Sequence, residues 1–195
     1  MTDTGRCFGP VFTADGERIV FGQEWWDPTA RAELFSVKLD GSDLRQLTDR
    51  ERKRAFAATS DPRGVLMVKS GRSMWNQIWF VGLDGTGSHR LPTGSMRNGA
   101  SRPVLSPDRQ TVFYVAEQGS LGYRYDLFST RVRGDDPPER LTTEEAYIAL
   151  GLSVSPDGRD LLFVLEQAGG VDRGKGEICT VPVAGGEVTV VGTNY

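Results

Sequence analysis

A short turn recurs four times along the 195 residues of this chain, and it constrains the fold more than any other feature. Each copy combines a Ser or Thr with an Asp, and an apolar segment follows each one. The four copies lie at 13–16, 60–64, 106–109 and 155–158. Such residues are typical of tight connections between antiparallel strands. Since no segment shows sustained helical periodicity, the pattern predicts a series of hairpins.

A longer unit repeats around this turn. The apolar strand after the turn is followed by a variable loop, a second strand and a short polar strand. Equivalent positions in the second strand are Phe35, Trp79, Phe128 and Cys179, which are 44, 49 and 51 residues apart. This spacing is typical of four-stranded β-propeller blades. One small sheet leaves two apolar faces uncovered, so several copies must stack face to face.

The sequence therefore predicts an all-β protein, a β-propeller built of four four-stranded antiparallel blades per chain. We expect one domain over residues 1–195, with blades at approximately 8–48, 54–92, 100–142 and 149–191. Two assemblies fit this prediction: a closed four-bladed ring, or half of an eight-bladed ring formed by a homodimer. An open half-ring exposes apolar faces on its first and last blades, which favours the homodimer.

The order Ser-Pro-Asp-Gly, apolar strand, Glu/Asp-Leu/Ile, Asp-Gly and Leu-Thr resembles the TolB-type, WD-like propeller repeat. It is also similar to propeller domains that accompany prolyl-oligopeptidase-type hydrolases. The resemblance runs from about Pro10 to Val191 and implies the fold, because the functions of such proteins differ widely. The first residues show no signal-peptide pattern and the chain lacks room for the extra domain of TolB, so we do not expect TolB's own role.

The composition limits the partners. The formal net charge of −3 gives no global positive field, which argues against nucleic acid as a partner. No apolar run approaches the length of a membrane span, which predicts a cytoplasmic protein without membrane association. The two cysteines, Cys7 and Cys179, are expected to be reduced and structural. We expect no cofactor and no metal.

Binding residues are expected on the loops that join the second and third strands of each blade and on the connectors from one blade to the next, because these segments are long and dissimilar. Aromatic and charged residues gather there and could stack on a ligand or anchor a partner protein. The candidates are Trp25, Trp26, Asp27, Trp75, Tyr123, Arg124 and Tyr125. The alternative is that individual rings cap the core between blades.

Three glutamates, Glu24, Glu117 and Glu166, are placed at one repeat position when the copies are aligned on the Ser or Thr of the turn, and Gly71 takes this place in the second copy. Matching carboxylates could bind a basic group, or one could act as an acid or base if its pKa were raised. The plainer interpretation is a solvent-exposed strand end inherited with the repeat.

The sequence favours a non-catalytic scaffold that binds a protein, peptide or small ligand through its long-loop face and central channel. His89 is the only histidine and is expected in an outer strand, which argues against a histidine-based metal cluster or a Ser-His-Asp triad. The alternative is a lyase- or cyclase-like enzyme, with Glu24, Glu117, Glu166 and Tyr125 as its acid-base candidates.

Overall fold

The structure is a computed structural model that describes residues 5–25, 32–48, 55–61, 63–70, 76–94, 99–118, 124–142, 147–166 and 176–193. These residues form strands and turns and contain no helix. Their contacts divide the chain into two compact units, residues 1–91 and 92–195, which are described separately. The single-domain boundary stays a prediction.

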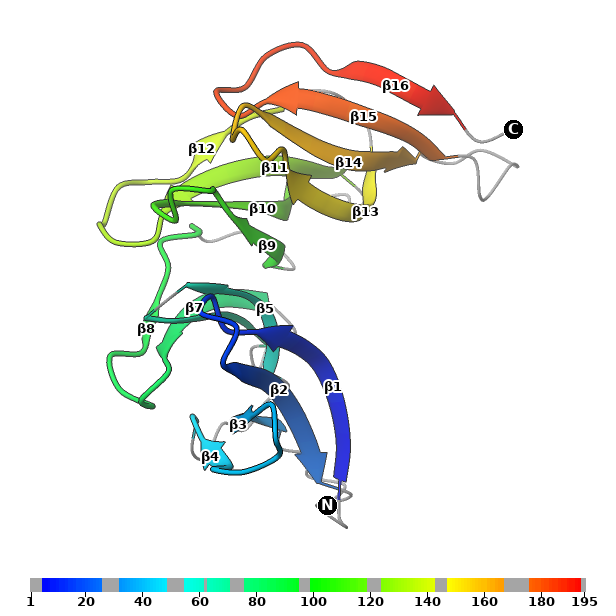
Figure 1. Ribbon diagram of the computed structural model, residues 1–195. Helices are drawn as coiled ribbons and strands as arrows, with labels where there is room; N and C mark the ends of the chain where they lie inside the picture. The colour runs from blue at the N-terminus through cyan, green and yellow to red at the C-terminus, as the bar shows by residue number, and fades with distance from the viewer. Residues whose placement is uncertain are drawn as a thin grey trace. The chain divides into compact units, whose positions relative to one another are not determined.

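The first unit contains two antiparallel four-stranded sheets, each in simple sequential order (Figure 1). The first blade consists of β1 (Gly5–Phe12), β2 (Arg18–Trp25), β3 (Ala32–Lys38) and β4 (Arg45–Gln46). The second blade consists of β5 (Ala55–Asp61), β6 (Gly64–Ser70), β7 (Asn76–Gly82) and β8 (His89–Arg90). His89 therefore lies in an outermost strand, as expected.

The second unit contains two further blades of the same order. The third consists of β9 (Ala100–Leu105), β10 (Thr111–Gln118), β11 (Arg124–Arg131) and β12 (Glu139–Arg140). The fourth consists of β13 (Tyr147–Val154), β14 (Asp160–Glu166), β15 (Gly176–Pro182) and β16 (Thr189–Thr193). One parallel bridge, from Tyr125 to Tyr147, joins these two blades. The predicted fold of four four-stranded antiparallel blades is confirmed.

The repeat positions chosen from the sequence occupy equivalent places in the sheets. Each is paired with the same position of the preceding strand, and the pairs are Phe21 with Phe35, Met67 with Trp79, Tyr114 with Phe128, and Phe163 with Cys179. In the first and third blades the paired rings also stack, with centroids 6.1 and 5.7 Å apart. The regular spacing of the repeat therefore reflects the same pairing register between the second and third strands of all four blades.

The recurrent turn is held by a hydroxyl group and a carboxylate. Thr13 Oγ1 donates to Asp15 Oδ1 at 2.5 Å and accepts the backbone amide of Arg18 at 3.0 Å. The same arrangement recurs at Ser106 with Asp108 and at Ser155 with Asp157. These hydrogen bonds lower the pKa of all three carboxyl groups. The bonds to the backbone amides also fix where the second strand of each of these blades begins.

The second blade departs from this turn. Asp61 and Gly64 are directly paired, so only two residues connect β5 to β6. A Cβ atom at Gly64 would clash with the Phe80 ring and the Val81 carbonyl oxygen. The glycine there permits close packing, and the equivalent positions of the other blades carry side chains.

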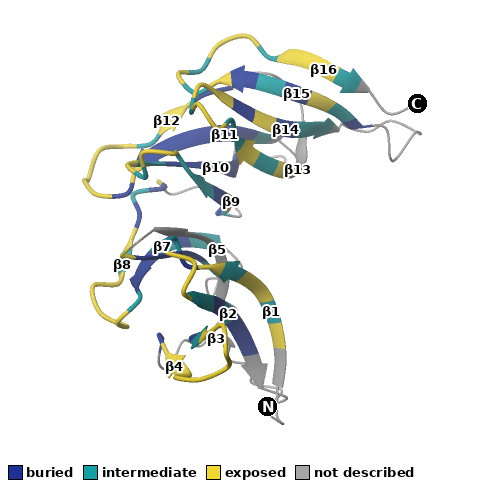
Figure 2. Ribbon diagram, in the orientation of Figure 1, coloured by how far each residue is buried: buried dark blue, intermediate teal, exposed yellow. Residues whose placement is uncertain are grey.

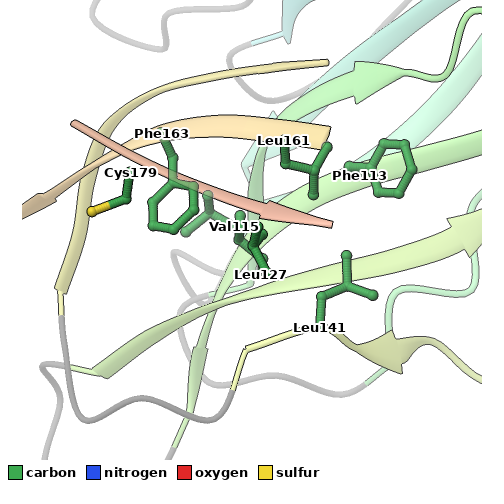
Figure 3. Packing of buried hydrophobic residues seen from close by; sticks show 8 residues of the cluster. Phe113, Val115, Leu127, Leu141, Leu161, Phe163 and Cys179 are labelled. Atoms are coloured by element: carbon green, nitrogen blue, oxygen red, sulfur yellow. The ribbon is translucent and has the colours of Figure 1, made fainter. Parts of the chain in front are cut away.

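The apolar core of each unit lies between its two blades. In the first unit Val20, Leu34 and Leu47 pack against Val65, Met67 and Val81. In the second unit Figure 3 shows side chains of β10 and β11 meeting those of β14 and β15, among them Val115, Leu127, Leu161, Phe163 and Cys179. Figure 2 shows β10 and β11 largely buried and β12 and β16 largely exposed. Face-to-face stacking thus buries the apolar faces, as the repeat predicts.

The two cysteines have different environments. Cys179 is fully buried in the core of the second unit, as expected of a structural residue, and burial raises the pKa of its thiol. Cys7 is exposed, so the expected structural role does not hold for it. Both are free thiols.

Candidate functional site

The second and third strands of each blade meet the long loops at one end, which we call the loop end. The recurrent turns lie at the opposite end, which we call the turn end. The structure extends the strands into the expected loops, because β2 continues to Trp25, β10 to Gln118 and β11 begins at Arg124. Several candidates are therefore held by sheet hydrogen bonds, which position them more rigidly than a loop would.

The three glutamates occupy one register position at the loop end. Glu24 is paired with Ala32, Glu117 with Tyr125, and Glu166 with Gly176. In the second blade this position belongs to Ser70, which is paired with Asn76. The assignment of Gly71 was wrong because the shorter Asp61–Gly64 hairpin shifts the alignment by one residue.

Glu117 differs from the exposed strand end expected for it. Its side chain is only 1% exposed. Burying a carboxylate is costly unless other groups stabilise it, so its presence here requires a polar or charged surrounding. The side chains of Glu24 and Glu166 lie outside the described part of the structure.

Tyr125 lies directly opposite Glu117 in the register of β10 and β11 and forms the bridge to Tyr147 in the fourth blade. Its side chain is partly buried. Burial raises the pKa of the Tyr125 phenol, the charge of Glu117 raises it further, and the charge of Arg102 lowers it. The phenol is therefore protonated at neutral pH and can donate a hydrogen bond.

Arg102 completes this group, and the sequence reasoning missed it. It is exposed and lies in the irregular part of β9 with a φ of 52°, a left-handed conformation that strains a residue with a side chain. The positions four residues before the recurrent turn in the first and fourth blades are Gly9 and Gly151, with φ of 55° and 59°. An alignment of the copies on Thr13, Ser106 and Ser155 would have shown that the third copy has an arginine where the first and fourth have a glycine.

A second polar cluster in the third blade is structural. Asp126 is 1% exposed, forms a 2.7 Å ion pair with Arg140 and accepts a hydrogen bond from Thr142 Oγ1 at 3.3 Å. The first blade repeats the hydrogen bond from threonine to carboxylate with Thr48 and Glu33. These residues connect the third strand of the blade to its outer strand, so they stabilise the sheet.

For the remaining candidate residues, the structure describes no contact with Glu117, Tyr125 or Arg102. Trp25 ends β2 and Arg124 begins β11, but their side chains lie outside the described residues. Trp26, Asp27, Trp75 and Tyr123 also lie outside them. The candidate site therefore consists of Glu117 and Tyr125, which were expected, together with Arg102.

The described residues contain no group of three or more His, Cys, Asp or Glu side chains that could hold a metal ion. Within the same part of the chain, no helix has the length and apolarity needed to cross a membrane.

Comparison with known proteins identifies the fold. No protein-family model and no curated protein sequence matches the chain. Among solved structures, the putative TolB from Agrobacterium tumefaciens is 17% identical with a TM-score of 0.73, and the match covers 97% of this chain and 66% of that one. A puromycin hydrolase is 16% identical with a TM-score of 0.75, and the match covers 99% of this chain and 33% of that one.

An oligogalacturonate lyase in complex with manganese is also similar, at 16% identity and a TM-score of 0.74, over 98% of this chain and 54% of that one. The chain thus spans between one third and two thirds of the length of these three proteins. At such identities the similarity defines the architecture, and the named proteins include both enzymes and TolB. The chain has the TolB-like β-propeller fold.

Proposed function

We propose that the chain is a non-catalytic scaffold that binds a protein, peptide or small ligand at its loop end, with Glu117, Tyr125 and Arg102 as part of the site. The observation that carries the proposal is the left-handed backbone of Arg102, at a position where Gly9 and Gly151 avoid strain. Residues in such backbone conformations cluster at binding and catalytic sites, and Arg102 differs from the similarly strained Arg109 because its charge acts on Tyr125.

The chemistry of the three groups favours a ligand that contains an anionic group. Arg102 supplies a positive charge, and the protonated Tyr125 phenol supplies a hydrogen bond donor. A guanidinium and a hydrogen bond donor together suit a carboxylate. Glu117 adds a hydrogen bond acceptor for a hydroxyl or amide group of the same ligand.

The other candidates are proposed to bind ligand at the loop ends of their own blades. Their aromatic rings would supply stacking surfaces and their charged groups would orient the ligand. They are Trp25, Trp26, Asp27, Trp75, Tyr123, Arg124, Glu24 and Glu166.

Two arginine-to-glycine variants test the proposal. Arg102→Gly removes the side chain from the site, and Arg109→Gly removes an equally charged residue with a φ of 59° at the turn end of the same blade. Oligogalacturonate and a short Glu-rich peptide serve as carboxylate-bearing probes in calorimetric titrations. We expect Arg102→Gly to weaken binding of at least one probe by about tenfold or more, and Arg109→Gly to leave it unchanged. Equal affinities of the two variants and the unmodified chain would contradict the site.

An enzymatic function is the second candidate, supported by the similarity to oligogalacturonate lyase and by the cross-strand pairing of Tyr125 with the carboxylate-bearing Glu117. In such an enzyme Tyr125 would protonate the leaving oxygen, while one of Glu24, Glu117 and Glu166 would remove a proton from carbon. Tyr125→Phe would then abolish formation of the unsaturated product and retain oligogalacturonate binding. Binding without any product in the unmodified chain favours the scaffold.

We further propose that the chain acts in the cytoplasm and pairs with a second copy. Leu162 and Ile178, which are 42% and 43% exposed, lie on the face of the fourth blade directed away from the core of the second unit. Exposed apolar surface of this kind favours self-association. Leu162→Glu is expected to convert a dimer to a monomer in sedimentation equilibrium, and a monomeric unmodified chain would contradict the pairing.

A further inference from the structure

A pocket of about 360 Å³ lies at the turn end of the third blade, at the opposite end of β10 from Glu117. Its polar and charged lining comes mainly from the third blade, and one apolar residue comes from the fourth. The residues that matter are Thr111, Ser129, Arg131, Asp136, Glu139 and Val183. The pocket is thus part of the crevice between these two blades.

The first blade has residues at the same positions in the repeat. Arg18 is paired with Lys38 as Thr111 is paired with Arg131. Ser36 is paired with Arg45 as Ser129 is paired with Glu139. An aspartate follows the serine at the same sequence distance in both blades, Asp43 in the first and Asp136 in the third. The paired strand residues therefore correspond directly, whereas the connection that carries the aspartate is one residue longer in the third blade.

A guanidinium group fills this place in the first blade. Arg18 Nη1 forms a 2.8 Å ion pair with Asp43 Oδ2, and Nη2 donates to the Asp43 carbonyl oxygen at 2.6 Å. The same guanidinium donates to Ser36 Oγ from Nη2 at 3.2 Å and from Nε at 3.3 Å. Serine, aspartate and a backbone carbonyl together thus form a cradle for a guanidinium group.

The second blade fills the place differently. Gly64 takes the position of Arg18, and Phe80 takes the position of Ser36. The ring of Phe80 lies directly over Gly64, where a Cβ atom would clash with it. This blade therefore needs no polar cradle.

The third blade has a serine and an aspartate in the lining of its pocket and lacks the arginine that joins them in the first blade. Thr111 stands where Arg18 would be, and its side chain is too short to reach a neighbouring loop. Ser129 is only 8% exposed, lines the pocket and forms no side-chain hydrogen bond among the described residues. A hydroxyl group that faces a pocket and has no hydrogen bond to the protein is available to a ligand.

The charges point to a cationic ligand. In the first blade Arg18 and Arg45 both pair with Asp43. In the third blade Thr111 and Glu139 replace these arginines. In the part of the chain that the structure describes, neither Asp136 nor Glu139 forms an ion pair. Compared with the first blade, the third blade thus has two fewer positive charges and one more carboxylate at these positions.

One positively charged side chain, Arg131, lines the pocket, but it interacts with Thr111 and Asp108. Its Nη1 donates to Thr111 Oγ1 at 3.4 Å, and its charge helps to lower the pKa of Asp108 in the adjacent turn. Arg131 therefore closes one side of the pocket and leaves Ser129 and Asp136 for a ligand.

We propose that this pocket binds a guanidinium group from solution, in the orientation that Arg18 adopts in the first blade. The group would donate to Ser129 Oγ and pair with the Asp136 carboxylate. Its two possible sources are the arginine side chain of a peptide and a small guanidinium compound. The site is separate from the loop end and does not depend on the function proposed for it.

Titrations followed by amide NMR shifts of the full chain test this proposal. The probes are ethylguanidine and the peptide Gly-Arg-Gly, and the neutral control is ethylurea. We expect saturable shifts around Thr111 and Ser129 with a guanidinium probe and none with ethylurea. Tighter binding of Gly-Arg-Gly would assign the site to peptides, and tighter binding of ethylguanidine to small compounds. Equal binding of ethylurea, or no saturable shift with either probe, would overturn the proposal.

Two pairs of matched variants make the test specific. Asp136→Asn should weaken binding about tenfold or more, while Asp135→Asn, which removes the same charge one residue away, should change it less than about threefold. Thr111→Arg should fill the pocket from within and abolish binding, and Thr111→Ser should retain it. Unchanged binding by a folded Thr111→Arg chain would overturn the proposal, and if that variant does not fold, the two aspartate variants decide.

Discussion

The hydroxyl group of Thr48 donates a 2.5 Å hydrogen bond to the carboxylate of Glu33, and both residues are buried. The same Thr48 oxygen accepts the backbone amide of Leu34 at 2.9 Å. The Leu-Thr sequence at the end of the repeat thus has a physical role, since the threonine connects the third strand of the blade to the outermost segment.

Replacing Thr48 with Val should lower the free energy of unfolding by about 1–3 kcal/mol, because a buried carboxylate loses a donor and a buried amide loses its acceptor. Urea unfolding measures this loss. Thr48→Ser keeps the hydroxyl and should cost less than about 1 kcal/mol, the value of one buried methyl group. Equal losses in the two variants would show that the hydrogen bonds contribute little.

Asp43 should make stability depend on pH. Hydrogen bonds from Arg45 and Arg18 lower the pKa of its carboxyl group from 3.8 to about 2 in the folded chain. A lowered folded-state pKa gives stability that is complete above the unfolded value and is lost as the pH falls toward the folded value. The difference in unfolding free energy between the unmodified chain and Asp43→Asn should therefore be constant from neutral pH to about pH 5 and shrink toward pH 2.

Because Asp43 is partly exposed, the same difference should also decrease as salt is added. A difference for Asp43→Asn that grows on acidification would contradict the ion pair.

The core between the third and fourth blades should respond strongly to truncation. Leu161 is fully buried and Leu39 is 57% exposed. Leu161→Ala should lower the free energy of unfolding by about 2–5 kcal/mol, because it removes buried apolar contacts and leaves a cavity. Leu39→Ala should change it by about 0.5 kcal/mol or less. Denaturant unfolding compares the two, and similar losses would argue against the stacked blades.

Arg109 offers a stabilising substitution. It adopts a φ of 59° in the turn where Gly16 and Gly158 have a φ of 74°. Arg109→Gly should raise the free energy of unfolding by up to about 1 kcal/mol, since relief of strain exceeds the added freedom of the unfolded chain. Arg109→Ala retains the strain and should give no gain. Thermal unfolding distinguishes them, and a gain from Ala alone would contradict the explanation.

The blades could be predicted from the sequence because the residues that define each turn lie close together in the chain. The hydroxyl and carboxylate that hold the recurrent turn lie two residues apart, as in Thr13 and Asp15. The common register of Phe35 and Phe128 follows from regular spacing between such turns. Where a turn changes length, as between Asp61 and Gly64, the alignment moves by one residue, and the expected place of Gly71 is lost.

The candidate site was less predictable because burial and backbone conformation decide it. The position of Glu117 at a strand end was evident from the repeat, but the repeat did not indicate that its side chain is only 1% exposed. The unusual place of Arg102 could have been found by aligning the repeat copies, because Gly9 and Gly151 take the same position, but its φ of 52° comes only from the structure. The pocket at Ser129 became evident only when the cross-strand partners of two blades were compared.

The outermost strands β4, β8 and β12 have two residues each, whereas β16 has five. Since a strand held by so few backbone hydrogen bonds opens readily, the rims of the first three blades should exchange their amide protons with solvent through frequent local fraying. The central strands would retain theirs until a whole blade opens. Unfolding of each of these blades would therefore begin at its outermost strand and proceed toward its central strands.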